Sequence, residues 1–301
     1  IKLIYGANEI LPNYSTVINS YLGVNQSWDN SDAQTEGLDL EYSKKDFSST
    51  ELADAERALD QQIADEGFVL LKNDGDSLPL ESGTTLSFVG GNSRSFGSGA
   101  QNILAKTLGI SDESDDALTP AMQQAGFSVN QTLMDFYRTG KGKDYVMGPG
   151  SVTYGESEDF SINECPLSVL SDAGVLDSLE GTTPVFVFKR VAGEGRDMPR
   201  SMYNHASSDE DKAKSYLEPD STELEILQYL NDHFDNTVLL VNTNAAVELG
   251  WLDQFPNIKS VLYVPSTGTY GTQELGKILN GSVNPSGRTV DTFARNPSKS
   301  P

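Results

Sequence analysis

The chain has 301 residues, 37% of them hydrophobic, so it is long and apolar enough to bury a hydrophobic core. Its 44 acidic residues outnumber 21 Lys and Arg and give a net charge of -23. Because this field repels phosphate backbones and anionic lipid surfaces, we expect no nucleic acid partner and no membrane contact from this segment.

Cys165 is the only cysteine, so no intramolecular disulfide can form. A lone cysteine fits a reducing compartment and also a secreted protein without disulfides. The acidity is compatible with an extracellular or cell-surface setting, but it leaves the localisation open. The chain begins at Ile1 and ends in a polar tail, so we expect it to be part of a longer polypeptide.

The first 50 residues are polar and broken by Asn, Ser, Gly and Pro, which predicts an extension rather than part of the core. Helical spacing begins near residues 48–51, where Ser and Thr precede a Glu as a helix start signal. The residues expected on one face of this helix are Leu52, Ala55, Leu59, Ile63, Ala64 and Gly67.

Four short apolar runs follow, and each leads into a loop rich in Gly, Asn or Ser. They lie at residues 86–89, 185–188, 237–241 and 260–264. Continuous hydrophobicity at this length indicates strands buried on both faces, as in a parallel sheet covered by helices. Residues 222–230 and 275–279 supply two covering helices. The predicted fold is a layered α/β/α sandwich with a mostly parallel sheet of about five to six strands.

Ligands of open parallel sheets sit at the carboxyl ends of the strands, so the loops after the four runs are expected to share one edge. These loops span residues 90–99, 191–197, 242–244 and 265–271. They are rich in Gly, Asn, Ser and Thr and almost free of Lys. Such a composition suits neutral, hydroxyl-rich ligands better than phosphates.

Several catalytic motifs are absent from the sequence. Neither GxxxxGK[ST] nor GxGxxG follows the first apolar run, which disfavours a nucleotide-binding protein. No GxSxG elbow, HExxH motif or Cys/His cluster occurs, so the sequence predicts neither a metal site nor a cofactor. His205 and His233 are interpreted as surface or packing residues.

Glu194 lies between two glycines in the loop after the apolar residues 184–188, where a ligand can approach closely. One hypothesis is a general acid/base whose pKa is tuned by arginines and apolar walls. The alternative is a carboxylate that caps a helix or pairs with Arg190, Arg196 or Arg200. Asp197 is too close in sequence for the two to straddle a glycosidic bond, since paired glycosidase carboxylates are ~5 to 9 Å apart.

Glu164 is a second candidate carboxylate, within residues 160–166. The segment follows a polar stretch and precedes Pro166, which favours an extended structural segment over a catalytic one.

Five sequence segments occur in the order found in one enzyme family. They are EGFVLLKNDG with LPL at residues 66–80, the glycine loop at 86–99, GEGRD at 193–197, NTN at 242–244 and GSVNPSGR at 281–288. Together they resemble the second, α/β domain of the family-3 glycoside hydrolases, which include β-glucosidases. The resemblance covers about residues 51–295, so we expect an extension at 1–50 and this domain at 51–301.

The resemblance implies a retaining glycosidase with its active site between two domains. In the family a (β/α)8 barrel supplies the nucleophilic Asp, commonly in an SDW-like motif, and the α/β domain supplies the acid/base Glu, which matches Glu194. No SDW-like segment occurs in this chain, so we expect the nucleophile to lie in a missing barrel and the domain alone to be inactive. The implied partners are that barrel and an oligosaccharide or glycoside substrate, with Arg196 and Asp197 as substrate-binding residues.

The chain departs from the family pattern at Ala192, where Ser is common, at Arg196, and after Asn242, where Pro is missing. These departures leave the substrate preference open. Residues 126–137 and the INECP segment look most like members with reversed domain order, so we expect the barrel to follow Pro301. The alternative function is a non-catalytic carbohydrate-binding or scaffold module of the same fold.

Overall fold

The computed structural model describes residues 48–95, 118–148, 150, 158–192, 197–265, 267 and 271–296. From Ser49 onward these residues belong to one compact unit, which extends to Pro301. All structural statements below concern these residues. Glu194 and Arg196 lie outside them.

A six-stranded sheet forms the middle layer, with strand order β1-β6-β5-β4-β2-β3. Strands β3, β2, β4, β5 and β6 run parallel, and β1 pairs antiparallel with β6 at one edge. Their bounds are β1 Val69–Asn73, β2 Thr85–Val89, β3 Ser128–Val129, β4 Thr183–Lys189, β5 Thr237–Asn242 and β6 Ile258–Tyr263. The four apolar runs are therefore confirmed as parallel strands, and the mostly parallel α/β sandwich is confirmed with them.

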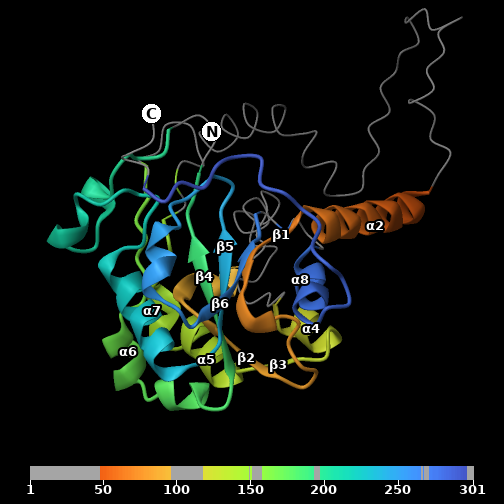
Figure 1. Ribbon diagram of the computed structural model, residues 1–301, viewed down its shortest axis with the longest axis horizontal. Helices are drawn as coiled ribbons and strands as arrows, with labels where there is room; N and C mark the ends of the chain where they lie inside the picture. The colour runs from red at the N-terminus through yellow and green to blue at the C-terminus, as the bar shows by residue number, and fades with distance from the viewer. Residues whose placement is uncertain are drawn as a thin grey trace, which may run out of the picture. The chain divides into compact units, whose positions relative to one another are not determined.

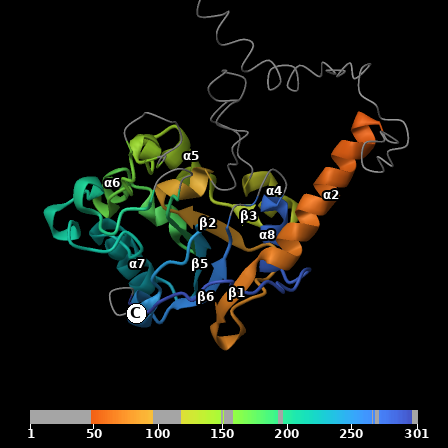
Figure 2. The same cartoon turned by 90° about the horizontal axis from the view of Figure 1, so that it is seen from above.

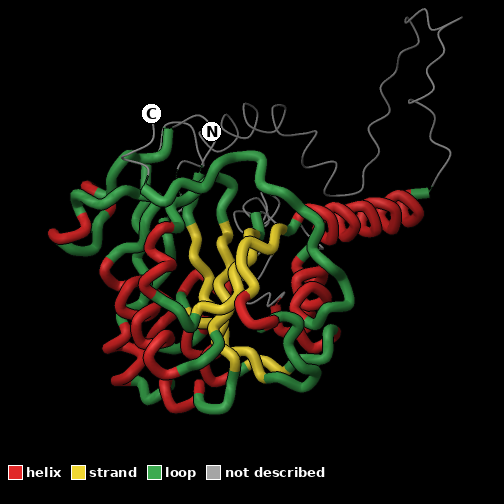
Figure 3. The backbone as a smooth tube through the Cα atoms, in the orientation of Figure 1, coloured by secondary structure: helices red, strands yellow, loops and turns green. Residues whose placement is uncertain are grey.

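Helices cover both faces of this sheet (Figures 1 and 2). Helices α5, α6 and α7 lie on one face, and α2, α4 and α8 lie on the other, which gives three layers (Figure 3). The bounds are α2 Ser49–Gly67, α4 Leu118–Gln124, α5 Gln131–Arg138, α6 Leu167–Asp172, α7 Ser221–His233 and α8 Thr272–Leu279. The two covering helices predicted from the sequence correspond to α7 and α8.

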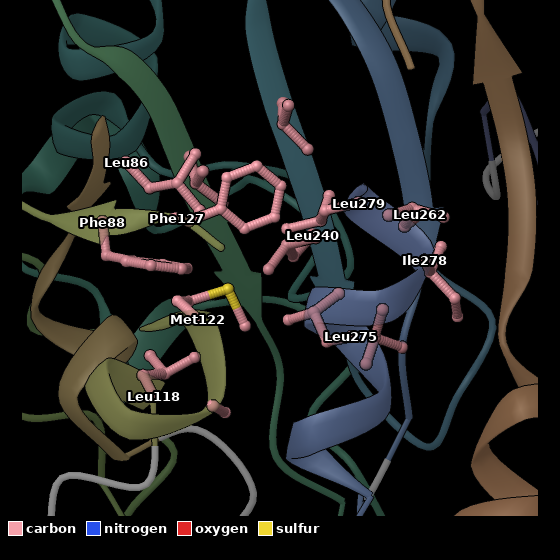
Figure 4. Close-up of a cluster of buried hydrophobic side chains, with 14 of the residues drawn as sticks. Leu86, Phe88, Leu118, Met122, Phe127, Leu240, Leu262, Leu275, Ile278 and Leu279 are labelled. Atoms are coloured by element: carbon pink, nitrogen blue, oxygen red, sulfur yellow. The ribbon is translucent and has the colours of Figure 1, made fainter. Parts of the chain in front are cut away.

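Side chains of β4 alternate between the two hydrophobic layers, as the pleat of a strand requires. Val185 and Val187 join the cluster under α4 and α8, whereas Phe186 and Phe188 join the cluster under α5, α6 and α7. All four are fully buried. Figure 4 shows part of the first cluster, in which residues of α4 and α8 meet residues of β2, β5 and β6. Burial on both faces explains why the strand reads as an unbroken apolar run.

Helix α7 begins with a capping box that the sequence prediction did not include. The Asp220 side chain accepts a hydrogen bond from the Glu223 backbone N–H at 2.8 Å, and Glu223 accepts one from the Asp220 backbone N–H at 3.0 Å. Two backbone donors at the start of the helix are thereby satisfied. This cap fixes the residue at which α7 starts.

Helix α2 is confirmed, but its apolar face does not pack as a whole. Leu52, Leu59 and Ile63 are 41%, 57% and 60% exposed, and only Ala64 of the expected face is buried. The helix runs away from the sheet, so that its last turns alone contact α8 (Figure 1). In the described part of the chain, no helix combines the length and the apolar character needed to cross a membrane.

Candidate active site

The loops after the parallel strands begin at a common edge of the sheet. The backbone register pairs Val89 of β2 with Phe186 of β4, Lys189 of β4 with Asn242 of β5, and Val241 of β5 with Tyr263 of β6. The described starts of the four predicted loops therefore meet at the carboxyl edge, where ligands of such sheets bind.

Two of these loops are joined by a side chain. The Asn242 amide donates hydrogen bonds to the backbone carbonyls of Val264 and Pro265, at 2.9 and 3.2 Å. Asn242 is buried, so its amide connects the end of β5 to the loop after β6. The predicted Asn-Thr-Asn turn therefore contributes a structural bond at this edge.

Asp197 is the one candidate residue of the GEGRD segment that the structure describes, and its side chain is exposed. It follows the four residues 193–196 and precedes Met198, which packs on a buried cluster. An exposed carboxylate is accessible to a ligand. The roles of Glu194, Arg196 and Asp197 remain predictions.

Arg190 is the first residue after β4, and its guanidinium is completely buried. It forms a bidentate ion pair with Glu223, at 2.9 Å from Nη1 to Oε1 and 2.7 Å from Nη2 to Oε2. It also donates to the carbonyls of Tyr216, Glu218 and Lys189 at 2.7, 2.6 and 2.6 Å. An arginine has five N–H donors, and these contacts use all of them. Arg190 is therefore committed to structural contacts and has no donor left for Glu194.

Asp220 lies beside this ion pair, and its backbone N–H donates to Glu223. Its carboxyl is 1% exposed. Burial, followed by the negative charge of Glu223, raises the pKa of Asp220 from 3.8 to about 7. The Arg190 donors bond to Glu223 and to backbone carbonyls, so Asp220 receives no hydrogen bond from this guanidinium to offset its burial.

Tyr216 contacts the backbone of Val191, two residues after the end of β4. Its hydroxyl accepts a hydrogen bond from the Val191 backbone N–H at 3.2 Å and lies 3.4 Å from the Val191 carbonyl oxygen. Its ring joins a buried cluster with Met147, Phe160, Ile162 and Met202. Val191 and Met198, on either side of residues 193–196, pack against this cluster. We call these five buried residues the loop platform.

Glu164 is also buried, at 4% exposure, but its carboxylate faces the backbone after β2. Its Oε1 accepts hydrogen bonds from the N–H groups of Gly91 and Cys165, both at 2.8 Å. Its Oε2 has no hydrogen-bond partner among the described residues. Burial, opposed by these two bonds, raises the pKa of Glu164 from 4.5 to about 8. Within the described structure, this carboxyl holds the Gly90–Gly91 turn.

The sequence analysis missed the Arg190, Glu223 and Tyr216 contacts. One local signal was available, because Asp220-Ser221-Thr222-Glu223 has the spacing of a capping box. The partner of Glu223 lies 33 residues earlier in the chain, and no periodic pattern connects the two. Within the described ranges, no three His, Cys, Asp or Glu side chains form a group suited to a metal ion.

Comparisons with known proteins agree with this architecture. A family model described as the glycosyl hydrolase family 3 C-terminal domain matches residues 68–301. The chain is 30% identical over 242 residues to a β-glucosidase from Ruminococcus albus, covering 77% of this chain and 22% of that protein. It is 25% identical over 256 residues to β-glucosidase A from Butyrivibrio fibrisolvens, covering 77% of this chain and 28% of the relative.

Two solved structures have the same fold. A β-glucosidase from Paenibacillus barengoltzii has a TM-score of 0.60 at 21% identity, over 81% of this chain and 25% of that one. β-Glucosidase 3B from Thermotoga neapolitana, in complex with α-D-glucose, has a TM-score of 0.55 at 19% identity, over 85% and 32%. The chain thus spans between 22% and 32% of the length of these four proteins.

Proposed function

The chain belongs to the glycosyl hydrolase family 3 C-terminal domain family, and from this we propose that it is the α/β domain of a two-domain retaining β-glucosidase. In this proposal the domain supplies the general acid/base, Glu194. A (β/α)8 barrel elsewhere in the same polypeptide supplies the nucleophilic Asp. The substrate is a β-glucoside or oligosaccharide.

The observation that carries the proposal is the position of β4 in the fold. It is a central strand of the parallel sheet, and its carboxyl end, Lys189, lies at the edge where ligands of such sheets bind. The GEG motif follows β4 in the sequence, after Arg190, Val191 and Ala192. This order supports a role for the motif at that edge.

Retaining hydrolysis needs two carboxyl groups on opposite sides of the scissile bond, ~5 Å apart. In the proposed first step, Glu194 transfers its proton to the glycosidic oxygen as the C1–O bond breaks, and the barrel's Asp bonds to C1. In the second step, the Glu194 carboxylate removes a proton from water, whose oxygen bonds to C1 and releases the Asp. The two proton transfers return Glu194 to its starting state.

The contacts of Arg190 matter for the pKa that Glu194 needs as a general acid. A general acid must hold its proton near neutral pH, and a direct ion pair with a buried arginine lowers a carboxyl pKa. All five Arg190 donors are engaged by Glu223 and by backbone carbonyls. Of the three arginines considered as ion-pair partners, this one is therefore unavailable to Glu194.

The test uses the two-domain polypeptide and substrates that differ in leaving group. Glu194→Ala is expected to lower kcat/KM by ~100-fold or more for alkyl glucosides, which need protonation, and much less for dinitrophenyl glucoside. The 301-residue chain alone is expected to hydrolyse neither. Equal activity of the variant and the wild-type enzyme on alkyl glucosides would refute the assignment, and a coding sequence without a barrel would favour the non-catalytic module.

A further inference from the structure

We propose that Tyr216, Arg190 and Glu223 are positioning residues that fix the loop carrying Glu194, an inference that rests on the proposed function. None of the three is proposed to touch substrate. They act through the backbone on both sides of residues 193–196. Their role is to set where the acid/base meets the glycosidic oxygen.

The first anchor holds the side of the loop that leaves β4. Arg190 donates to the carbonyls of Tyr216 and Glu218, so the end of β4 is bonded to the segment that leads into α7. Its guanidinium carbon lies 4.2 Å from the centre of the Phe188 ring, which adds a cation–π contact within the same strand end. Val191, three residues before Glu194, is bonded to the Tyr216 hydroxyl.

The second anchor holds the other side of the loop. Ser201 forms an antiparallel bridge with Ser215, and the Met202 N–H donates to the Lys214 carbonyl at 3.0 Å. Both ends of the loop are therefore bonded to one segment, residues 214–218. We call this segment the clamp, because it is bonded to the described backbone on both sides of residues 193–196.

The loop platform supports the clamp through buried side chains that pack together, and Tyr216 belongs to both. Phe160 and Tyr216 are fully buried and meet edge to face, with ring centres 5.7 Å apart. Val191 and Met198 pack on the platform from the two ends of the loop. Val191 is three residues before Glu194 in the sequence, and a residue adds at most ~3.6 Å of chain. In the proposed role, the clamp acts on Glu194 by holding Val191.

Glu223 makes the clamp possible because it neutralises Arg190 at a fully buried position. A buried guanidinium without a carboxylate would be strongly disfavoured, and a buried ion pair gives little net stability over apolar residues of the same volume. Its geometric effect is different, because a bidentate pair with three carbonyl contacts permits one orientation. A fixed orientation is what an acid/base loop needs, since small displacements of a catalytic group cost large factors in rate.

Tyr216→Phe is the mildest test, because it removes the hydroxyl that contacts Val191 and leaves the ring and the Tyr216 carbonyl in place. Thr182→Val is the matched control, since it also removes a hydroxyl bonded within the same structure. That hydroxyl donates to the Leu179 carbonyl at 2.8 Å and contacts Ser87, at the amino end of β4 rather than its carboxyl end. Arg190→Lys, which keeps the charge and loses the fork, is the stronger second variant.

The experiment measures kcat and KM of the two-domain enzyme on alkyl and dinitrophenyl glucosides. For Tyr216→Phe we expect about a 10-fold loss of kcat/KM on alkyl glucosides and less than about 2-fold on dinitrophenyl glucoside, because kcat/KM reports the step in which Glu194 acts as the acid. Arg190→Lys should show the same selectivity with a larger loss. Thr182→Val should be like the wild type on both substrates.

The outcomes separate this inference from the proposed function. If Glu194→Ala loses activity selectively on alkyl glucosides and Tyr216→Phe does not, the positioning role is wrong and the acid/base assignment stands. An equal loss of kcat/KM on both substrates in Tyr216→Phe also overturns the inference, because it indicates a general structural fault. If Glu194→Ala shows no selectivity, the proposed function fails, and the positioning role fails with it.

Discussion

Replacing Glu164 by Gln should make the folding stability of the domain less dependent on pH. Glu164 is buried, and its pKa rises from 4.5 to about 8 on folding. Between these two values the folded state retains a proton that the unfolded state releases. Stability therefore falls as the pH rises from about 4.5 to about 8 and then levels off. Glutamine cannot ionise, so the variant lacks this loss.

The expected size follows from the difference between the two pKa values. One pH unit corresponds to ~1.4 kcal/mol for one proton, so the wild type should lose about 3 kcal/mol between about pH 5.5 and about pH 8 that the variant does not lose. At the lower pH the variant should be equally stable or somewhat less stable. The amide oxygen of Glu164→Gln can still accept from Gly91 and Cys165, but the NH2 group takes the place of an oxygen without a partner among the described residues.

Urea unfolding of the 301-residue chain, followed by circular dichroism at about pH 5.5, 7 and 8.5, checks this prediction. The measured quantity is the difference in free energy of unfolding between the wild type and Glu164→Gln, in which pH effects of other groups largely cancel. Glu225→Gln, on the outer side of α7, is the control and should show no such trend. A difference that stays constant across this pH range would show that folding does not raise the pKa of Glu164.

Three further predictions concern α7 and α8. Asp220→Asn should keep the helix cap and lose less stability between about pH 5 and 8 than the wild type, because burial and Glu223 raise the pKa of Asp220 to about 7. A parallel pH trend of both proteins in urea unfolding would contradict this. Leu275→Ala should lower the free energy of unfolding by ~2–5 kcal/mol, because Leu275 is fully buried. Leu59→Ala, at a 57% exposed position, should lower it by ~0.5 kcal/mol or less, and equal losses would count against the described core. Gly276→Ala should lower the thermal unfolding midpoint despite the better helix propensity of Ala, because the added Cβ would lie 2.7 Å from Ala125 Cβ. A higher midpoint would show that α4 and α8 can separate.

The fold was predictable where burial leaves a local pattern. Strands β4 and β5 read as unbroken apolar runs because helices cover both faces, and the runs were assigned correctly as parallel strands. Strand β1 was missed because only one of its five residues is buried, and β3 was missed because it has two residues. The periodicity of α2 predicted a helix, but it carries no information about which surface covers the helix.

The candidate site was predictable only in part, because its supports are far apart in the sequence. The GEG loop is predicted from a motif and from the strand before it, and of these the strand is confirmed as β4. Arg190 contacts Glu223 and Tyr216, which lie 33 and 26 residues later, and neither contact leaves a spacing that sequence reasoning can read. The interpretation that Arg190 pairs with Glu194 was reasonable from proximity in the chain. In the structure, Arg190 pairs instead with the buried Glu223.

The acid/base role of Glu194 is tested by the product that the two-domain Glu194→Ala enzyme forms from dinitrophenyl β-glucoside in the presence of azide. An acid/base variant can still form the covalent intermediate from an activated substrate, and small azide can then attack C1 without base assistance. If Glu194 is the acid/base, turnover should be faster with azide and the product should be a β-glucosyl azide, identified by the anomeric coupling in its NMR spectrum. No acceleration, or an α-glucosyl azide, would contradict the assignment of Glu194 as the acid/base.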